Sequence, residues 1–134
     1  MRNKKLDELV IQMENYLECW KQFNYFINLA RTKKFSAEDE NQFLEVKSVI
    51  ARELELILAS IETTTPAKED VLNLISSAPS IRYLSEMPYG SLRGVDKQRH
   101  TVFIRFQSLL GQLNVQQKQM ESESRFSSLF GRKK

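Results

Sequence analysis

The sequence predicts an all-α fold, specifically an antiparallel four-helix bundle of the up-down type. Apolar residues recur every three or four positions through four stretches, which places them on one face of each helix. The 134 residues include only four glycines and three prolines, whereas sandwiches and barrels need frequent turn residues. A hydrophobic share of 41% and a charged share of 28% are typical of one globular domain.

The first helix is predicted from near Asn3 to near Lys33, and it carries the strongest pattern in the sequence. Its apolar stripe comprises Leu6, Leu9, Val10, Met13, Tyr16, Leu17, Trp20, Phe23, Ile27 and Ala30. Trp20, Phe23 and Phe26 have the spacing of a buried helix face, so we assign them to the core rather than to a cofactor site. A helix of this length, roughly 45 Å at about 1.5 Å per residue, needs neighbours to cover its stripe.

A short turn from Thr32 to Phe35 separates the first helix from a second one that starts at Ser36. The Ser36 hydroxyl can cap a free amide, and the acids at positions 38–40 favour the positive end of the helix dipole. The second apolar stripe comprises Phe43, Val46, Ile50, Leu54, Ile57 and Ile61. Because the turn is short, the two helices should pack as antiparallel neighbours.

The middle of the chain should hold a third, shorter helix and one further helical turn. The break at Thr63 to Thr65 is followed by Pro66, which suits the first position of a helix because its missing amide proton costs nothing there. The buried face of this helix lies between Val71 and Ala78, and Ser80 should cap the extra turn. Residues 86–94 include one proline and two glycines, so they predict an irregular loop.

The fourth helix is predicted from about Val95. Its stripe comprises Val102, Phe106, Leu109, Leu113 and Met120. Gly111 within it costs about 1 kcal/mol relative to alanine, which suggests a close helix contact. The sequence becomes polar after Glu121, so we expect a bundle domain over residues 1–121 and a mobile, basic tail over residues 122–134.

The sequence lacks the patterns that carry catalysis or metal binding. His100 and Cys19 are the only histidine and cysteine, so they cannot fill a tetrahedral zinc shell, and the Glu-x-x-His pairs of a di-metal bundle are absent. We therefore predict a non-enzymatic protein with no metal and no cofactor. His100 reads as an exposed helix residue, and Cys19 as a small apolar residue at a helix flank.

Charge is distributed unevenly along the chain. Residues 1–65 carry nine basic and eleven acidic residues, whereas residues 66–134 carry eleven basic and six acidic ones. The first group of candidate partner-binding residues lies around the predicted loop and the start of the fourth helix: Arg82, Arg93, Lys97, Arg99, His100 and Arg105. The second group consists of apolar tail residues that precede a basic end: Phe126, Leu129 and Phe130.

These features favour an interaction module, an adaptor or scaffold whose partner is another protein or a second copy of the chain. One alternative is a weak nucleic-acid-binding protein that uses the basic surface of the fourth helix. Another is a small-ligand-binding bundle lined by Tyr16, Tyr83, Tyr89 and His100. The sequence has no apolar run long enough for a transmembrane helix or a signal peptide, so we expect a cytoplasmic protein.

One further pattern carries a resemblance to known proteins. Trp20 and Phe23, followed by Ser36-Ala-Glu-Asp-Glu40 and by Phe43-Leu44 and Lys47, resemble a group of small uncharacterised bacterial helical proteins. The likeness covers about the first sixty residues. It implies a bacterial helical bundle, and it implies no particular activity.

Overall fold

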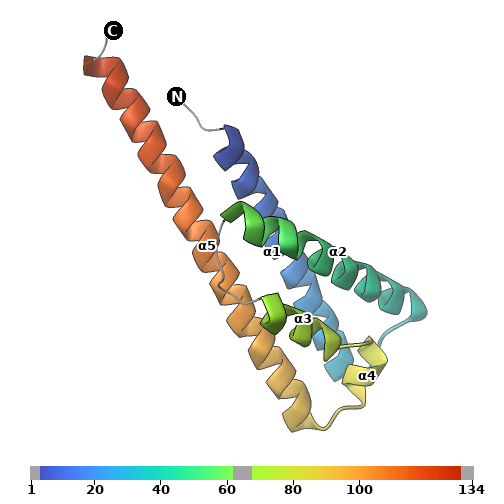
Figure 1. Ribbon diagram of the computed structural model, residues 1–134. Coiled ribbons are helices and arrows are strands. Elements are labelled where there is room, and N and C mark those ends of the chain that lie inside the picture. The colour runs from blue at the N-terminus through green and yellow to red at the C-terminus, as the bar shows by residue number, and fades with distance from the viewer. Residues whose placement is uncertain (1–3, 62–67, 131–134) are drawn as a thin grey trace.

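The computed structural model describes residues 4–61 and 68–130, without the side chains of Ser124 and residues 126–130. These residues form five helices: α1 (Lys4–Thr32), α2 (Ala37–Ile61), α3 (Lys68–Ser76), α4 (Ile81–Ser85) and α5 (Tyr89–Phe130) (Figure 1). No strand occurs among them. The predicted all-α class is therefore confirmed, as are the two long helices of the first half. The predicted break at residues 63–65 and Pro66 lie outside the described residues.

Helix α1 lies at the centre of the arrangement. It packs against both α2 and α5, which run antiparallel to it, and its C-terminal part contacts α4 (Figure 1). The short helix α3 contacts both α2 and α5. The described residues thus form three long helices and two short ones, and the short ones lie between α2 and α5 in the chain.

The core is built around aromatic side chains. Trp20, Phe23, Phe43 and Phe106 are fully buried. The ring centroids of Phe23 and Phe43 lie 5.3 Å apart, which joins α1 to α2, and those of Trp20 and Phe106 lie 6.3 Å apart, which joins α1 to α5. The assignment of Trp20 and Phe23 to the core is therefore confirmed. Burial of these large rings supplies much of the apolar area that stabilises the fold.

Side-chain caps fix where α2 and α4 begin. The Ser36 hydroxyl accepts a hydrogen bond from the Asp39 amide at 3.1 Å, and the Asp39 carboxylate accepts one from the Ser36 amide at 2.9 Å. This reciprocal pair confirms the cap that the sequence predicts at Ser36. Glu40 of α2 caps a helix that is distant in the sequence. Its two carboxylate oxygens accept hydrogen bonds from the amides of Ile81 and Arg82 at 2.7 and 3.0 Å. The start of α4 is therefore tied to α2.

The predicted loop over residues 86–94 is confirmed only for residues 86–88, because α5 begins at Tyr89 and includes both Gly90 and Gly94. The Pro88 carbonyl accepts hydrogen bonds from the amides of Ser91 and Leu92, so the proline stands just before the helix. Leu92 and Val95 are buried and extend the apolar stripe back toward the helix start. Their burial offsets the roughly 1 kcal/mol that each glycine costs a helix.

The far end of α5 also differs from the expected boundary at residue 121. The helix continues to Phe130, so residues 122–130 belong to the same element as the bundle. Figure 1 shows α5 running past the N-terminal end of α1. Near this end a side-chain hydrogen bond from Gln117 Nε2 to Asp7 Oδ1, at 2.7 Å, joins the two helices. Residues 131–134 of the predicted tail lie outside the described residues.

Candidate functional site

The first turns of α5 carry most of the basic residues that the sequence singles out. Because the expected loop is helical, Arg93, Lys97, His100 and Arg105 lie on one continuous helix, and all four are exposed. Among the described residues, none of the four forms an ion pair. We call these four residues the α5 basic face.

Arg99 does not belong to this face. Only 9% of the residue is exposed, and its Nε donates to Asp96 Oδ1 at 2.8 Å. Asp96 Oδ2 accepts a second bond, also at 2.8 Å, from Arg31 Nη2 on α1. Burial by itself would raise the pKa of Asp96, but the two arginines outweigh it and hold that pKa below its usual value. Arg99 thus shares the carboxylate of Asp96 with Arg31 of α1, and it is not available to a partner.

Arg82 is exposed but lies on a different element, α4. Its guanidinium carbon stands 6.0 Å from the centroid of the Phe35 ring, within the range of a cation–π contact. Its backbone amide is one of the two that Glu40 caps. The sequence groups Arg82 with basic residues that lie on α5. In the structure, Arg82 lies on α4 instead.

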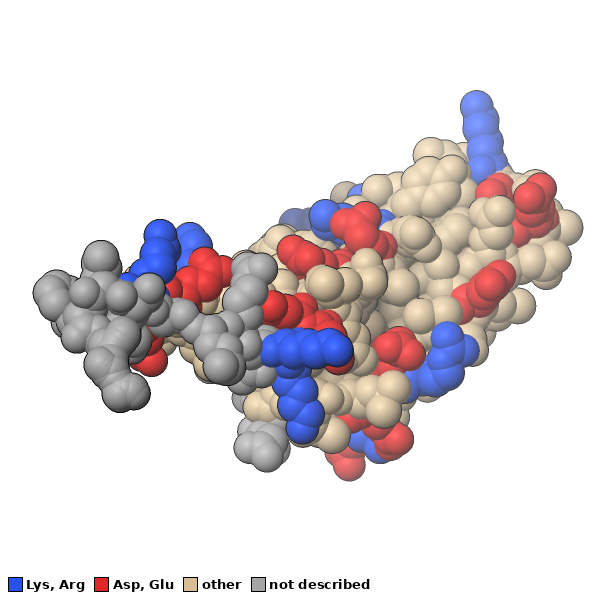
Figure 2. Space-filling model, turned by 90° about the horizontal axis from the view of Figure 1, so that it is seen from above, with Lys and Arg blue, Asp and Glu red and all other residues tan. Residues whose placement is uncertain are grey.

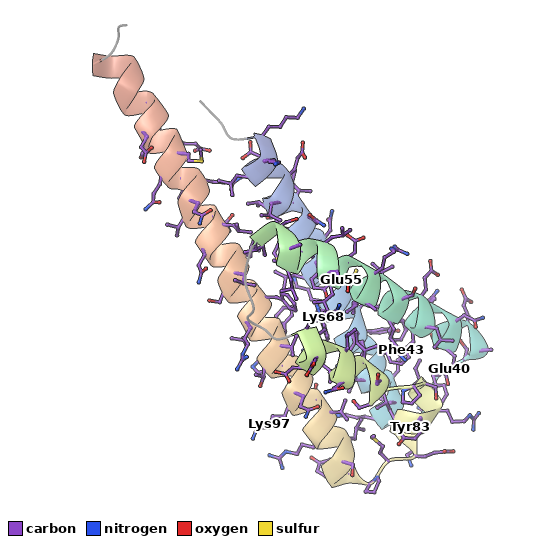
Figure 3. All side chains as sticks on the ribbon, in the orientation of Figure 1. Glu40, Phe43, Glu55, Lys68, Tyr83 and Lys97 are labelled. Atoms are coloured by element: carbon purple, nitrogen blue, oxygen red, sulfur yellow. The ribbon has the colours of Figure 1, made fainter. Side chains whose placement is uncertain are left out.

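A groove of about 530 Å³ lies between α3 and α5, beside the α5 basic face. The α3 wall contributes Asp70 and Asn73. The α5 wall contributes Gly94, Lys97, Gln98, Thr101, Val102 and Arg105. We call this feature the α3–α5 groove. Figure 3 shows Lys97 projecting from the surface of α5.

The groove combines two cations with neutral polar groups and one carboxylate. Lys97, Thr101 and Arg105 follow one another at intervals of four residues, so they line one side of the helix. The Thr101 hydroxyl donates to the Lys97 carbonyl at 3.1 Å, which leaves its oxygen free to accept a bond. The groove can therefore attract carboxylates or phosphates at its cations, and it can hydrogen bond to a polar chain between them.

The surface seen in Figure 2 differs from the α3–α5 groove in the distribution of its charges. Acidic and basic side chains are interspersed there over the surface that the described residues form, so it presents no broad region of one sign (Figure 2). Helix α2 is acidic overall, with six acids and two basic residues between Ala37 and Ile61. The exposed cations of α5 are therefore a better electrostatic match for acidic groups than the surface of α2.

The residues proposed to line a small-ligand pocket do not come together. Tyr16 is buried, and its hydroxyl donates to the Ile50 carbonyl at 3.0 Å. Tyr83 and Tyr89 are 51% and 77% exposed, on α4 and at the first residue of α5. Neither these tyrosines nor His100 lines the α3–α5 groove.

Cys19 is half-buried and lines a second groove, of about 490 Å³, between α1 and α2. Burial raises the pKa of its thiol, and the nearby carboxylates of Glu53 and Glu18 raise it further. A raised pKa lowers the thiolate fraction, which is the reactive form. The structure thus agrees with the interpretation of Cys19 as an unreactive flank residue.

The second group of candidate residues cannot be placed. The backbone of Phe126, Leu129 and Phe130 belongs to α5, but their side chains lie outside the described residues. Among the described residues, no group of three or more His, Cys, Asp or Glu side chains is placed to hold a metal ion. None of the described helices is both long and apolar enough to cross a membrane.

Sequence reasoning missed the other half of the groove. Asp70 and Asn73 lie on α3, and no spacing in the sequence links them to α5. Gln98 and Thr101 could have been found, because they share the face of Lys97 and Arg105 once the helix is known to start at Tyr89.

The chain matches no family model, no curated protein and no solved structure.

Proposed function

We propose that this chain is a non-enzymatic, cytoplasmic protein-interaction module that uses the α5 basic face to bind an acidic partner protein. We regard its fold as an irregular antiparallel four-helix bundle in which α3 and α4 together take the place of one long helix. The observation that carries the proposal is that Arg93, Lys97 and Arg105 are exposed on one helix and have no ion-pair partner among the described residues.

Three features support this function over the alternatives. Solvent-exposed cations steer an acidic partner to the surface and raise the rate of association. The polar residues expected to line a small-ligand pocket stand on separate parts of the molecule. A nucleic-acid surface would need cations that follow a phosphate backbone, but the groove beside the α5 basic face contains the carboxylate of Asp70.

The proposal is tested by comparing two variants of equal net charge. The first changes Arg93, Lys97 and Arg105 to glutamine, and the control changes Lys21, Arg52 and Lys118, which are exposed elsewhere. Each protein is cross-linked in native extract after nuclease treatment, and the captured proteins are identified by mass spectrometry. We expect wild type and control to capture the same acidic protein, and the first variant to lose it.

Two results would count against the proposed function. One is capture of the same proteins, in the same amounts, by both variants. The other is capture that disappears on nuclease treatment, because the bound species would then be a nucleic acid, whose affinity should also fall steeply with salt.

A further inference from the structure

The α3–α5 groove has cations at two points along one wall. Lys97 and Arg105 are eight residues apart on α5, so their positions are separated by about 12 Å along the helix axis. Both line the groove, and neither pairs with Asp70 on the facing wall. A ligand with two negative groups at a similar separation could therefore contact both cations at once.

The remaining polar groups of the groove favour a ligand that both donates and accepts hydrogen bonds. Asn73 and Gln98 each carry an amide that can do either, and Thr101 offers an oxygen acceptor because its hydrogen is donated to the Lys97 carbonyl. A polypeptide backbone alternates N–H donors with C=O acceptors. A phosphate chain offers acceptors only, and the carboxylate of Asp70 would repel it.

From this arrangement we infer that the α3–α5 groove binds a short acidic peptide segment of the partner, with one carboxylate on Lys97 and another on Arg105. This inference rests on the proposed function and narrows it to one site and one kind of ligand. An extended chain advances about 3.3 Å per residue and alternate side chains share a face, so two acidic residues four positions apart span roughly the 12 Å. An N–H of the segment donates to Asp70.

Gly94 makes the groove testable without any change of charge. It lines the groove, and a Cβ added there meets nothing within 4 Å. Gly94→Leu therefore places an apolar side chain in the space that the peptide would use. Gly90→Leu is the matched control, because Gly90 lies on the same helix and is equally open but does not line the groove. Leucine is a better helix former than glycine, so both variants should fold.

The probe is a peptide taken from a random twelve-residue display library that is panned on the full chain. We expect the enriched peptides to share two Asp or Glu residues four positions apart. Binding of one such labelled peptide is then measured by fluorescence anisotropy. The double variant K97Q/R105Q should weaken binding about tenfold, in line with two partly exposed ion pairs. Gly94→Leu should weaken it by a similar factor, and Gly90→Leu should leave it unchanged.

Asp70→Asn distinguishes a peptide from a simple anion by the direction of its effect. Loss of the carboxylate should weaken binding of the peptide, because an N–H donor of the peptide loses its charged acceptor. The same substitution should strengthen binding of a ligand that carries only negative charge. Inorganic phosphate and a twelve-nucleotide thymidine oligomer serve as probes of such ligands. Tighter binding of the peptide to Asp70→Asn would overturn the inference, as would equal binding of the peptide to Gly94→Leu and wild type.

The inference and the proposed function fail in different ways. If K97Q/R105Q weakens peptide binding but Gly94→Leu does not, the α5 basic face binds acidic ligands outside the groove. Only the inference about the groove is then lost. If no acidic peptide is enriched, or if K97Q/R105Q binds it as wild type does, the inference fails outright. The proposed function then depends on the cross-linking comparison with native partners.

Discussion

At the scale of single residues, Tyr16 shows how a polar group is accommodated in the core. Its ring is 2% exposed and meets the Phe106 ring edge-on at 5.1 Å between centroids. Its hydroxyl donates to the Ile50 carbonyl, which joins α1 to α2. Burial raises the pKa of Tyr16 well above its usual value, so the hydroxyl keeps its proton and continues to donate.

Tyr16→Phe should therefore destabilise the fold by about 1 kcal/mol, the net contribution of one buried hydrogen bond. Chemical denaturation in urea measures the loss as a lower midpoint with an unchanged slope. Tyr25→Phe is the control, because Tyr25 is 55% exposed on the same helix and should tolerate the change. Equal midpoints for all three proteins would show that the Tyr16 hydroxyl contributes nothing.

Lys33, the residue after α1, has a backbone conformation that lysine disfavours. Its φ is 58°, in the left-handed region, and it is the only described residue other than glycine with a positive φ. Its amide donates to the Leu29 carbonyl at 3.0 Å, which closes the last turn of the helix. Glycine adopts this conformation without the strain that a Cβ brings.

Lys33→Gly should consequently stabilise the protein, by up to about 1 kcal/mol. The gain appears as a higher midpoint in thermal unfolding followed by circular dichroism. The same substitution at the neighbouring Lys34, which has no positive φ, should give no gain and a small loss through the entropy of the unfolded chain. The account of this helix end is wrong if the two variants unfold at the same temperature.

At the scale of helices, α1 and α5 are joined by an ion-pair network centred on Asp96. Arg99 and Arg31 both bind its carboxylate at 2.8 Å, and together they keep its pKa below the usual value despite burial. A folded-state pKa below the unfolded value adds stability at any pH above the unfolded pKa. That stability is lost as the pH falls through the folded pKa.

The contribution of Asp96 to stability should therefore be complete at pH 7 and should decline below about pH 4, the usual pKa of an aspartate. Asp96→Asn should lower the free energy of unfolding at pH 7 and should flatten its dependence on pH between about 5 and 2. Urea denaturation of both proteins across this range measures the difference. Parallel curves for the two proteins would show that Asp96 is not linked to folding in this way.

Helix α5 also carries an exposed glycine, Gly111, beside which the described residues leave open space. The sequence suggests a close helix contact at Gly111, but a Cβ added there meets nothing within 4 Å. That suggestion is wrong for the described residues of a single copy. Alanine at this position would gain helix propensity without a clash.

Gly111→Ala should stabilise the protein by about 1 kcal/mol and leave its mass in solution unchanged. Thermal unfolding gives the first quantity, and light scattering gives the second. A loss of stability together with a change of mass would mean that a second copy packs on this face, because then the added methyl group would meet a neighbour.

At the scale of the whole molecule, the sequence predicts what depends on local periodicity. The stripe of α1, the cap at Ser36 and the burial of Phe43 and Phe106 all follow from spacing and side-chain chemistry. The start of α5 at Tyr89 was not predicted, because glycines such as Gly90 and Gly94 are typical of loops. The burial of Leu92 and Val95, which outweighs them, depends on helices that are distant in sequence.

The site was harder to predict than the fold, because it depends on which helices meet. Arg99 looks in sequence like its basic neighbours, but only 9% of it is exposed, and this burial depends on how α5 packs in the fold. Asp70 and Asn73 join the groove through the packing of α3 on α5. Lys97 and Arg105 were predicted as binding residues, but the groove between them and α3 was not.

The most direct measurement of the central claim is a map of backbone amide shifts by nuclear magnetic resonance as the acidic peptide is added to the full chain. We expect the largest changes on groove residues of both walls, Asn73 on α3 and Lys97, Gln98 and Thr101 on α5. The amides beside Cys19 and Val46, in the groove between α1 and α2, should not move. Changes centred on that second groove, or on no contiguous surface, would contradict the claim that the α3–α5 groove is the binding site.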